Sequence, residues 1–186
     1  MIDEKPNYKD QTLELFAVTS NLLFTFLYIK QSSWAFFFGV LGPLLLALLL
    51  RKKRLIAETA LQGAYIFLTF LGLANTSMGW NISSLNVLDH FYIVVSGVGS
   101  VLLLGFLLKK YSNADLPYLD SFTTVFALIA TFLMMCLIHE AWLYWIIING
   151  VSVVLYLNKK LYFGVFMFLI YLFMSVDAYF RFGILT

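Results

Sequence analysis

Seven long apolar runs, divided by short polar breaks, constrain this chain of 186 residues more than any other feature. A helix needs about 20 mostly apolar residues to cross a bilayer roughly 30 Å thick, and every run is close to that length. None of the runs alternates between apolar and polar residues as a half-buried strand would. The sequence therefore predicts an all-α integral membrane protein with seven transmembrane helices, at residues 13–29, 33–50, 55–73, 88–108, 119–137, 141–157 and 161–180.

The composition agrees with a chain whose main solvent is lipid. Apolar residues make up 62% of the chain and charged residues 12%, against about 25% charged residues in a typical soluble domain. The polar start, residues 1–12, lacks the basic-then-apolar pattern of a cleaved signal peptide and is expected to form a cytoplasmic tail. The connections between the runs are short, so we expect residues 1–186 to form a single membrane domain.

The positive charges of the loops predict how the chain is oriented. Of the twelve Lys and Arg residues, only Lys30 and Arg181 fall on the side opposite the amino terminus. Cytoplasmic loops carry an excess of Lys and Arg, which predicts a cytoplasmic amino terminus and an external carboxyl terminus. The basic loops are expected to face anionic lipid headgroups, and nucleic-acid binding is not expected.

The first and last three runs share a layout that indicates an internal repeat. Trp34 begins the second run and Trp142 the sixth, and a glycine follows eight residues later in each, Gly42 and Gly150. A lysine pair then closes both runs. This layout predicts two parallel three-helix bundles joined by a linker helix, a 3+1+3 arrangement. The first bundle, the linker and the second bundle would cover residues 13–73, 88–108 and 119–180.

Polar side chains inside the apolar runs require a partner, because an unpaired polar group is costly in hydrocarbon. Gln62 and Asn149 lie deepest, and interhelical hydrogen bonding and ligand binding explain them equally well. Trp145 lies four residues before Asn149 and Trp142 one turn earlier, so the three share a helical face. A flat cationic ring could stack on this face while the amide fixes its orientation. An interfacial aromatic belt would explain the tryptophans as well.

The titratable residues do not indicate an enzyme. The two histidines, His90 and His139, lie on the predicted outer side beside Asp89 and Glu140. Solvated helix ends and loops account for both pairs, and the sequence has no His-Glu-x-x-His or Cys-x-x-Cys motif. We therefore expect no enzymatic activity, cofactor or metal. A structural or sensor membrane protein, which would carry no solute, stays an alternative.

Two motifs carry a resemblance to a known family. The first is the block Trp142-Leu-Tyr-Trp145-Ile-Ile-Ile-Asn149, which is followed by Tyr156 and the second lysine pair. The second runs from Gln62 through the aromatic turn at residues 79–80. Together they make nearly the whole chain resemble the Pnu-type vitamin transporters, the PnuC/PnuT family. The resemblance implies the 3+1+3 fold, inverted in the membrane relative to the SWEET proteins, and a location in the bacterial inner membrane.

The resemblance also implies an activity and a site. Its members pass a dephosphorylated B vitamin down its gradient by facilitated diffusion, and a cytoplasmic vitamin kinase traps the product, so no coupling ion is required. Trimers occur in the family, which implies a homo-oligomer. The residues that match the family's ligand-binding positions are Gln62, Tyr65, Trp142, Trp145, Asn149 and Tyr156.

One departure from the family pattern bears on the substrate. Asp177 stands where the family has a small residue, and it could attract a cationic vitamin near the external mouth or pair with Arg181 four residues on. Many riboside carriers also have an additional amino-terminal helix, which is not among the seven helices predicted here. Asp177 and the missing helix both favour the thiamine-carrying PnuT branch. Nicotinamide riboside, which also has a cationic aromatic ring, is the alternative, followed by riboflavin.

Overall fold

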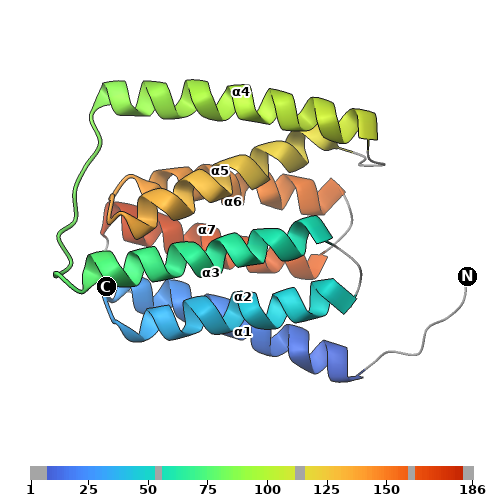
Figure 1. The fold of residues 1–186 in the computed structure, drawn as a ribbon, viewed down its shortest axis with the longest axis horizontal. Coiled ribbons are helices and arrows are strands. Elements are labelled where there is room, and N and C mark those ends of the chain that lie inside the picture. The colour runs from blue at the N-terminus through green and yellow to red at the C-terminus, as the bar shows by residue number, and fades with distance from the viewer. Residues whose placement is uncertain (1–7, 53–55, 112–115, 159–161, 182–186) are drawn as a thin grey trace, which may run out of the picture. The chain divides into compact units, whose positions relative to one another are not determined.

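A computed structural model describes residues 8–52, 56–111, 116–158 and 162–181, and these residues form seven helices (Figure 1). The prediction of an all-α chain with seven helices is confirmed. Most helices extend into polar residues beyond at least one end of the predicted runs, because the backbone hydrogen bonds of a helix do not require apolar side chains. The fifth helix, however, ends two residues before the end of its predicted run, and the seventh begins one residue after the start of its run. Their bounds are α1 Tyr8–Ile29, α2 Trp34–Lys52, α3 Ile56–Thr76, α4 Val87–Tyr111, α5 Pro117–Met135, α6 Ala141–Asn158 and α7 Tyr162–Phe180.

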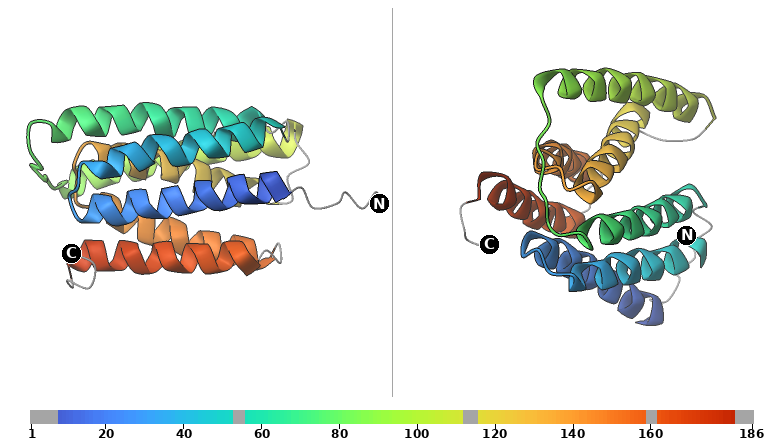
Figure 2. Two further views of the ribbon diagram at one scale, coloured as in Figure 1. Left: turned by 90° about the horizontal axis from the view of Figure 1, so that it is seen from below. Right: turned by 60° about the vertical axis from the view of Figure 1, so that its left-hand side comes forward.

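The helices fall into two compact units, each of which has its own packing. The first unit, Met1–Trp80, contains α1 to α3, and α2 packs against both of the other helices (Figure 2). The second unit, Asn81–Thr186, contains α4 to α7; there α6 packs against α5 and α7, and α4 packs against α5. Among α1 to α3 the middle helix is thus α2, and among α5 to α7 it is α6. The helix that the sequence predicts as a linker, α4, belongs to the second unit.

Glycines allow close helix packing in the first unit. A Cβ atom added at Gly39 would lie 2.9 Å from side-chain atoms of both Phe24 in α1 and Thr69 in α3. A Cβ atom added at Gly42 would overlap the side-chain amide of Asn21. The absence of side chains at these two positions lets α2 approach both neighbours closely.

An aromatic cluster closes one end of the first unit. Trp80 follows α3 after a turn in which Gly79 has a φ of 106°. Its ring centroid lies 5.1 Å from that of Tyr28 near the end of α1, and it stacks on Phe36 near the start of α2 at 6.1 Å. Edge-to-face and offset-stacked rings at these distances are favourable arrangements. The segment after α3 is therefore held against the connection between α1 and α2.

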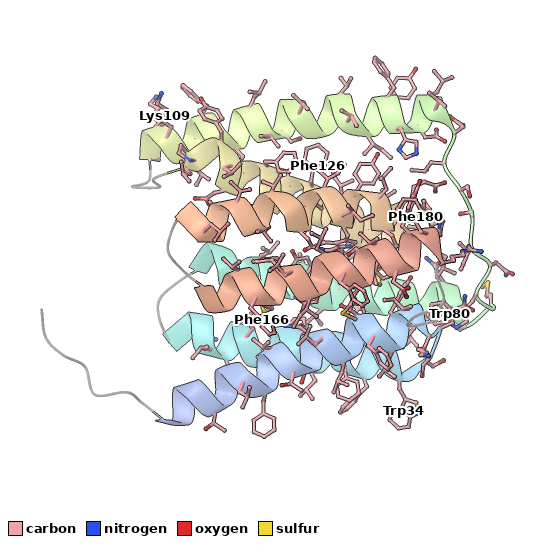
Figure 3. The ribbon with its side chains drawn as sticks, turned by 180° about the vertical axis from the view of Figure 1, so that it is seen from behind. Trp34, Trp80, Lys109, Phe126, Phe166 and Phe180 are labelled. Carbon is pink, nitrogen blue, oxygen red and sulfur yellow. The ribbon has the colours of Figure 1, made fainter. Side chains whose placement is uncertain are left out.

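In the second unit, α4 rests on α5 through small residues. Its buried residues are Gly97, Val101 and Gly105, which are four residues apart and share one face. A Cβ atom added at Gly97 would lie 2.8 Å from Phe126, a side chain that points toward α4 (Figure 3), and one at Gly105 would overlap Tyr118. The glycines let the rings of α5 pack directly on the α4 backbone.

Most of α4 is exposed although it is apolar. Among the described residues, α4 and α5 have the length and apolarity of membrane spans, but only 11% of the best window of α4 is buried, against 44% for α5. Shorter apolar helical stretches cover Leu15–Ile29, Trp34–Leu49, Ala141–Leu155 and Val165–Phe180. A long apolar helix with one narrow buried face is suited to lipid, because water would disfavour its exposed side.

Candidate functional site

A buried hydrogen bond of the second unit joins α6 to α7. Asn149 is 2% exposed, and its Nδ2 donates a hydrogen bond to Oγ of Ser175 over 3.2 Å. The Ser175 hydroxyl in turn donates to the backbone oxygen of Tyr171, 2.8 Å away. The interhelical hydrogen bond expected for Asn149 is therefore present. It uses one of the two N–H donors of the amide.

Asn149 belongs to a mixed polar and aromatic face of α6. Trp142, Trp145, Asn149 and Ser152 are three or four residues apart and so lie along one side of the helix. Trp142 is 9% exposed, Trp145 is half-buried, and Ser152 is buried. This α6 face combines large π surfaces with an amide and a hydroxyl, and it carries no charge. Such a face can stack on a flat ring and hydrogen-bond to its substituents.

An aromatic stack joins α4, α5 and α6. The ring of Tyr144 stacks on His90 with centroids 5.8 Å apart, and its hydroxyl lies 2.9 Å from Nδ1 of that histidine. The ring of Tyr144 also stacks on that of Phe126, with ring centroids 6.5 Å apart. The sequence indicated a solvated helix end for His90, but its ring packs against the buried Tyr144. This contact joins residues 54 positions apart, so no local spacing could have indicated it.

The second histidine has a different partner. His139 lies just before α6, and its Nε2 is 3.0 Å from the backbone oxygen of Tyr179 near the end of α7. Its ring also stacks on that of Tyr179, with centroids 5.3 Å apart. A carbonyl in the last turn of a helix has no partner within the helix, so the imidazole N–H caps it.

Asp89 and Glu140, the acids beside the two histidines, accept hydrogen bonds from backbone N–H groups. Asp89 and Asn86 cap the start of α4 reciprocally, each side chain accepting from the other's backbone N–H at 3.1 and 3.0 Å. Glu140 accepts from the backbone N–H of Leu85 over 3.0 Å. Within the described ranges no group of three or more His, Cys, Asp or Glu could hold a metal ion. These contacts thus stabilise the segment before α4 and the start of α6.

Asp177 is 1% exposed in the last turn of α7. Arg181 is exposed, lies beyond the end of the helix and has a φ of 52°. The pairing of Asp177 with Arg181 stays a prediction.

The remaining candidates lie in α3 and at the end of α6. Gln62 is buried in α3 and Tyr65 is half-buried one turn later. Gln62 shares a face with Thr69 and Thr76 at intervals of seven residues, and all three are buried. Tyr156 belongs to α6, but its side chain lies outside the described part of the structure. The structure thus groups Gln62 and Tyr65 in the first unit and the other candidates in the second.

An all-helical chain with a mostly exposed apolar helix and buried, uncharged polar faces has the features of a multi-pass membrane protein. The family model described as Nicotinamide mononucleotide transporter matches residues 11–182. The chain belongs to this family of PnuC-type transporters, and it is a multi-pass membrane transporter, not an enzyme.

A solved structure has the same fold. The chain is similar to the crystal structure of the vitamin B3 transporter PnuC, with a TM-score of 0.74 and 23% sequence identity. The match covers 95% of this chain and 83% of the other. No curated protein sequence matches this one. The PnuC family expected from the sequence is confirmed, whereas the thiamine branch finds no support and the PnuC-type alternative fits better.

Proposed function

We propose that this protein carries nicotinamide riboside, a dephosphorylated form of vitamin B3, across the membrane by facilitated diffusion. The observation that carries this proposal is the family match over residues 11–182, whose description names a nicotinamide nucleotide. The similar fold of a vitamin B3 transporter supports it. Thiamine as the substrate is supported only by sequence features such as Asp177.

The distribution of charge supports a nucleoside over its phosphate. By their positions in the sequence, all twelve Lys and Arg residues fall near helix ends or between helices, so none is placed to neutralise a phosphate inside the membrane. The buried polar groups described near the middle of the helices are amides and hydroxyls, on residues such as Gln62, Thr69, Asn149 and Ser175. A riboside, with hydroxyl groups and a carboxamide, matches these groups, and its positive ring suits aromatic neighbours.

The α6 face is the proposed centre of recognition. The rings of Trp142 and Trp145 would stack on the pyridinium ring, and the amide of Asn149 would hydrogen-bond to the ligand's carboxamide. An amide suits this role because it has both donors and an acceptor. The other candidates for ligand contact are Gln62, Tyr65, Tyr156 and Asp177.

The proposal includes an architecture and a cellular setting. We infer two three-helix bundles, with α4 as the helix between them, an amino terminus in the cytoplasm and a location in the bacterial inner membrane. The matching middle positions of α2 and α6 support the repeat, and the excess of basic residues on one side supports the orientation. Trapping by a cytoplasmic vitamin kinase and assembly into a homo-oligomer, such as a trimer, follow from the family resemblance.

A binding titration tests the substrate. The purified protein in detergent would be titrated with nicotinamide riboside, nicotinamide mononucleotide, thiamine and riboflavin while the fluorescence of its four tryptophans is followed. We expect saturable quenching by nicotinamide riboside and at least roughly 30-fold weaker binding of the mononucleotide, since a desolvated phosphate would lack a cation. Tight binding of thiamine alone would contradict the proposal and indicate a thiamine carrier. Binding of none of them would favour a protein without transport activity.

A further inference from the structure

A proline interrupts the hydrogen bonding of α2. Pro43 lies in the interior of this helix. It has no backbone N–H, so the carbonyl of Gly39, four residues earlier, loses its normal helical partner. Within a membrane no bulk water can replace that donor, and a neighbouring helix has to supply one. The carbonyl of Gly39 is therefore a point at which α2 depends on another element.

Thr69 of α3 supplies the donor. Its hydroxyl oxygen lies 3.1 Å from the backbone oxygen of Gly39, and the residue is 4% exposed. The same hydroxyl lies 2.8 Å from the backbone oxygen of Tyr65 in its own helix. It has a single proton to donate. Because the Tyr65 oxygen already accepts the helical N–H of Thr69, the Gly39 oxygen has the greater need of that proton.

The packing around Gly39 fixes this geometry. A Cβ atom at Gly39 would lie 2.9 Å from the methyl carbon of Thr69, tighter than real side chains pack. Any larger residue would push α3 away from α2 and lengthen the hydrogen bond. The glycine, the proline and the threonine therefore depend on one another: the glycine allows the approach, the proline frees the acceptor, and the threonine supplies the donor.

We propose that Gly39, Pro43 and Thr69 form a tie between α2 and α3, in which the Thr69 hydroxyl replaces the N–H that Pro43 lacks. The tie makes Thr69 a positioning residue for transport, because Tyr65 and Gln62 lie four and seven residues before it on the same helix. This second part rests on the proposed function, whereas the tie itself does not.

A double-mutant cycle on thermal unfolding tests the tie in the full chain in detergent. We expect Thr69→Val to lower the unfolding midpoint by about 2–4 °C in the native background, as the loss of one buried hydrogen bond in a chain of this size would. In a Pro43→Ala background the loss should shrink to about 1 °C or less, because the substitution restores a backbone N–H that pairs with the Gly39 carbonyl. Equal losses in both backgrounds would overturn the tie.

Two variants serve as controls. Thr76→Val removes a hydroxyl from the same face of α3, but that hydroxyl bonds within its own helix, to the oxygens of Gly72 and Leu73 at 3.0 and 3.2 Å. Its effect should be the same with and without Pro43. Thr69→Ser keeps the hydroxyl, so its midpoint should stay within about 1 °C of the native value. If it falls as far as that of Thr69→Val, the methyl group and not the hydrogen bond is responsible, and the tie is refuted.

Uptake kinetics in proteoliposomes test the positioning role. For nicotinamide riboside, Thr69→Val should raise KM by about 3- to 10-fold, while Thr69→Ser and Thr76→Val stay near the native value. An unchanged KM in Thr69→Val would refute the positioning role. Absence of riboside uptake by the native protein would instead refute the proposed function, and the unfolding cycle would still decide on the tie.

Discussion

The middle helices of the two units hold equivalent places but are built differently. In α2, the leading tryptophan Trp34 is 70% exposed and projects outward (Figure 3), whereas its counterpart in α6, Trp142, is 9% exposed. Both middle helices are bonded to a hydroxyl in the final helix of their unit, Thr69 in α3 and Ser175 in α7. Each hydroxyl lies 13 residues beyond the first residue of its helix. The position of the contact is shared, but its chemistry is not.

The difference separates a mechanical contact from one suited to recognition. In the first unit the partner is a backbone carbonyl, Gly39, freed by Pro43. In the second unit it is a side-chain amide, Asn149, a group that has both donors and an acceptor. The two middle helices thus make contacts at matching positions with different chemistry, a backbone carbonyl in α2 and a side-chain amide in α6. On this account the second unit supplies most of the recognition chemistry.

The two tryptophans give the largest expected contrast. Trp142→Ala should destabilise the protein by about 3–5 kcal/mol, because it removes a large buried side chain. Trp34→Ala should change stability by about 0.5 kcal/mol or less, as is usual at exposed positions. Thermal unfolding and riboside uptake of both variants measure the contrast. Similar losses of stability in the two variants would contradict the distinction between α2 and α6.

Asn149→Ala tests the recognition role of the second unit. Loss of the Asn149 amide should reduce kcat/KM for riboside uptake by about 30- to 100-fold. This corresponds to roughly 2–3 kcal/mol, the cost of leaving a polar group of the ligand without its hydrogen-bond partner. Ser175→Ala, which removes the acceptor of Asn149 and the hydrogen bond from Ser175 to the backbone oxygen of Tyr171, is the control and should reduce uptake by about 3-fold. If both variants lose uptake equally, Asn149 acts through α7 and not on the ligand.

The paired glycines test the packing difference. Gly42→Ala should cost about 1–3 kcal/mol of stability, because its new methyl group would overlap Asn21. At Gly150 the new methyl group would meet no atom within 4 Å apart from its chain neighbours and the backbone of its own helix, so Gly150→Ala should be neutral, or stabilising by up to about 1 kcal/mol through helix propensity. Unfolding midpoints give the answer. A stable Gly42→Ala would show that α1 does not depend on this close approach.

Tyr144→Phe tests the smallest of the expected contrasts between the two units. Tyr144 lies two residues after Trp142, as Phe36 lies two after Trp34, so the variant converts the second unit's residue into that of the first. It removes the hydrogen bond to His90 but keeps the stacking, and should cost about 1 kcal/mol. Differential scanning calorimetry of the two proteins would detect it. A cost of several kcal/mol would mean that the hydroxyl has a larger role than this contact.

The helices of this chain could be predicted from its sequence, but their partners could not. Apolar runs of membrane-spanning length specify where helices form, and Trp142, Trp145 and Asn149 could be placed on one face by spacing alone. Pairings such as Asn149 with Ser175 join residues far apart in the chain, so no local pattern indicates them. Thr69 is a further case: only Pro43, four residues after Gly39, signals that a donor is needed there.

The substrate was the weakest part of the prediction, for a physical reason. Thiamine and nicotinamide riboside both carry a positively charged aromatic ring, so an aromatic face with an amide suits either of them. The expectation of thiamine depended in part on Asp177, which the structure buries at the end of α7. A single buried acid does not distinguish between two cations.

Uptake of labelled nicotinamide riboside into proteoliposomes, with native protein and Asn149→Ala side by side, tests the central claim most directly. The account predicts saturable uptake by the native protein that needs no ion gradient, resists competition by nicotinamide mononucleotide, and is largely lost in Asn149→Ala while the variant stays folded. Uptake of thiamine instead, or riboside uptake that is unchanged in Asn149→Ala, would contradict it.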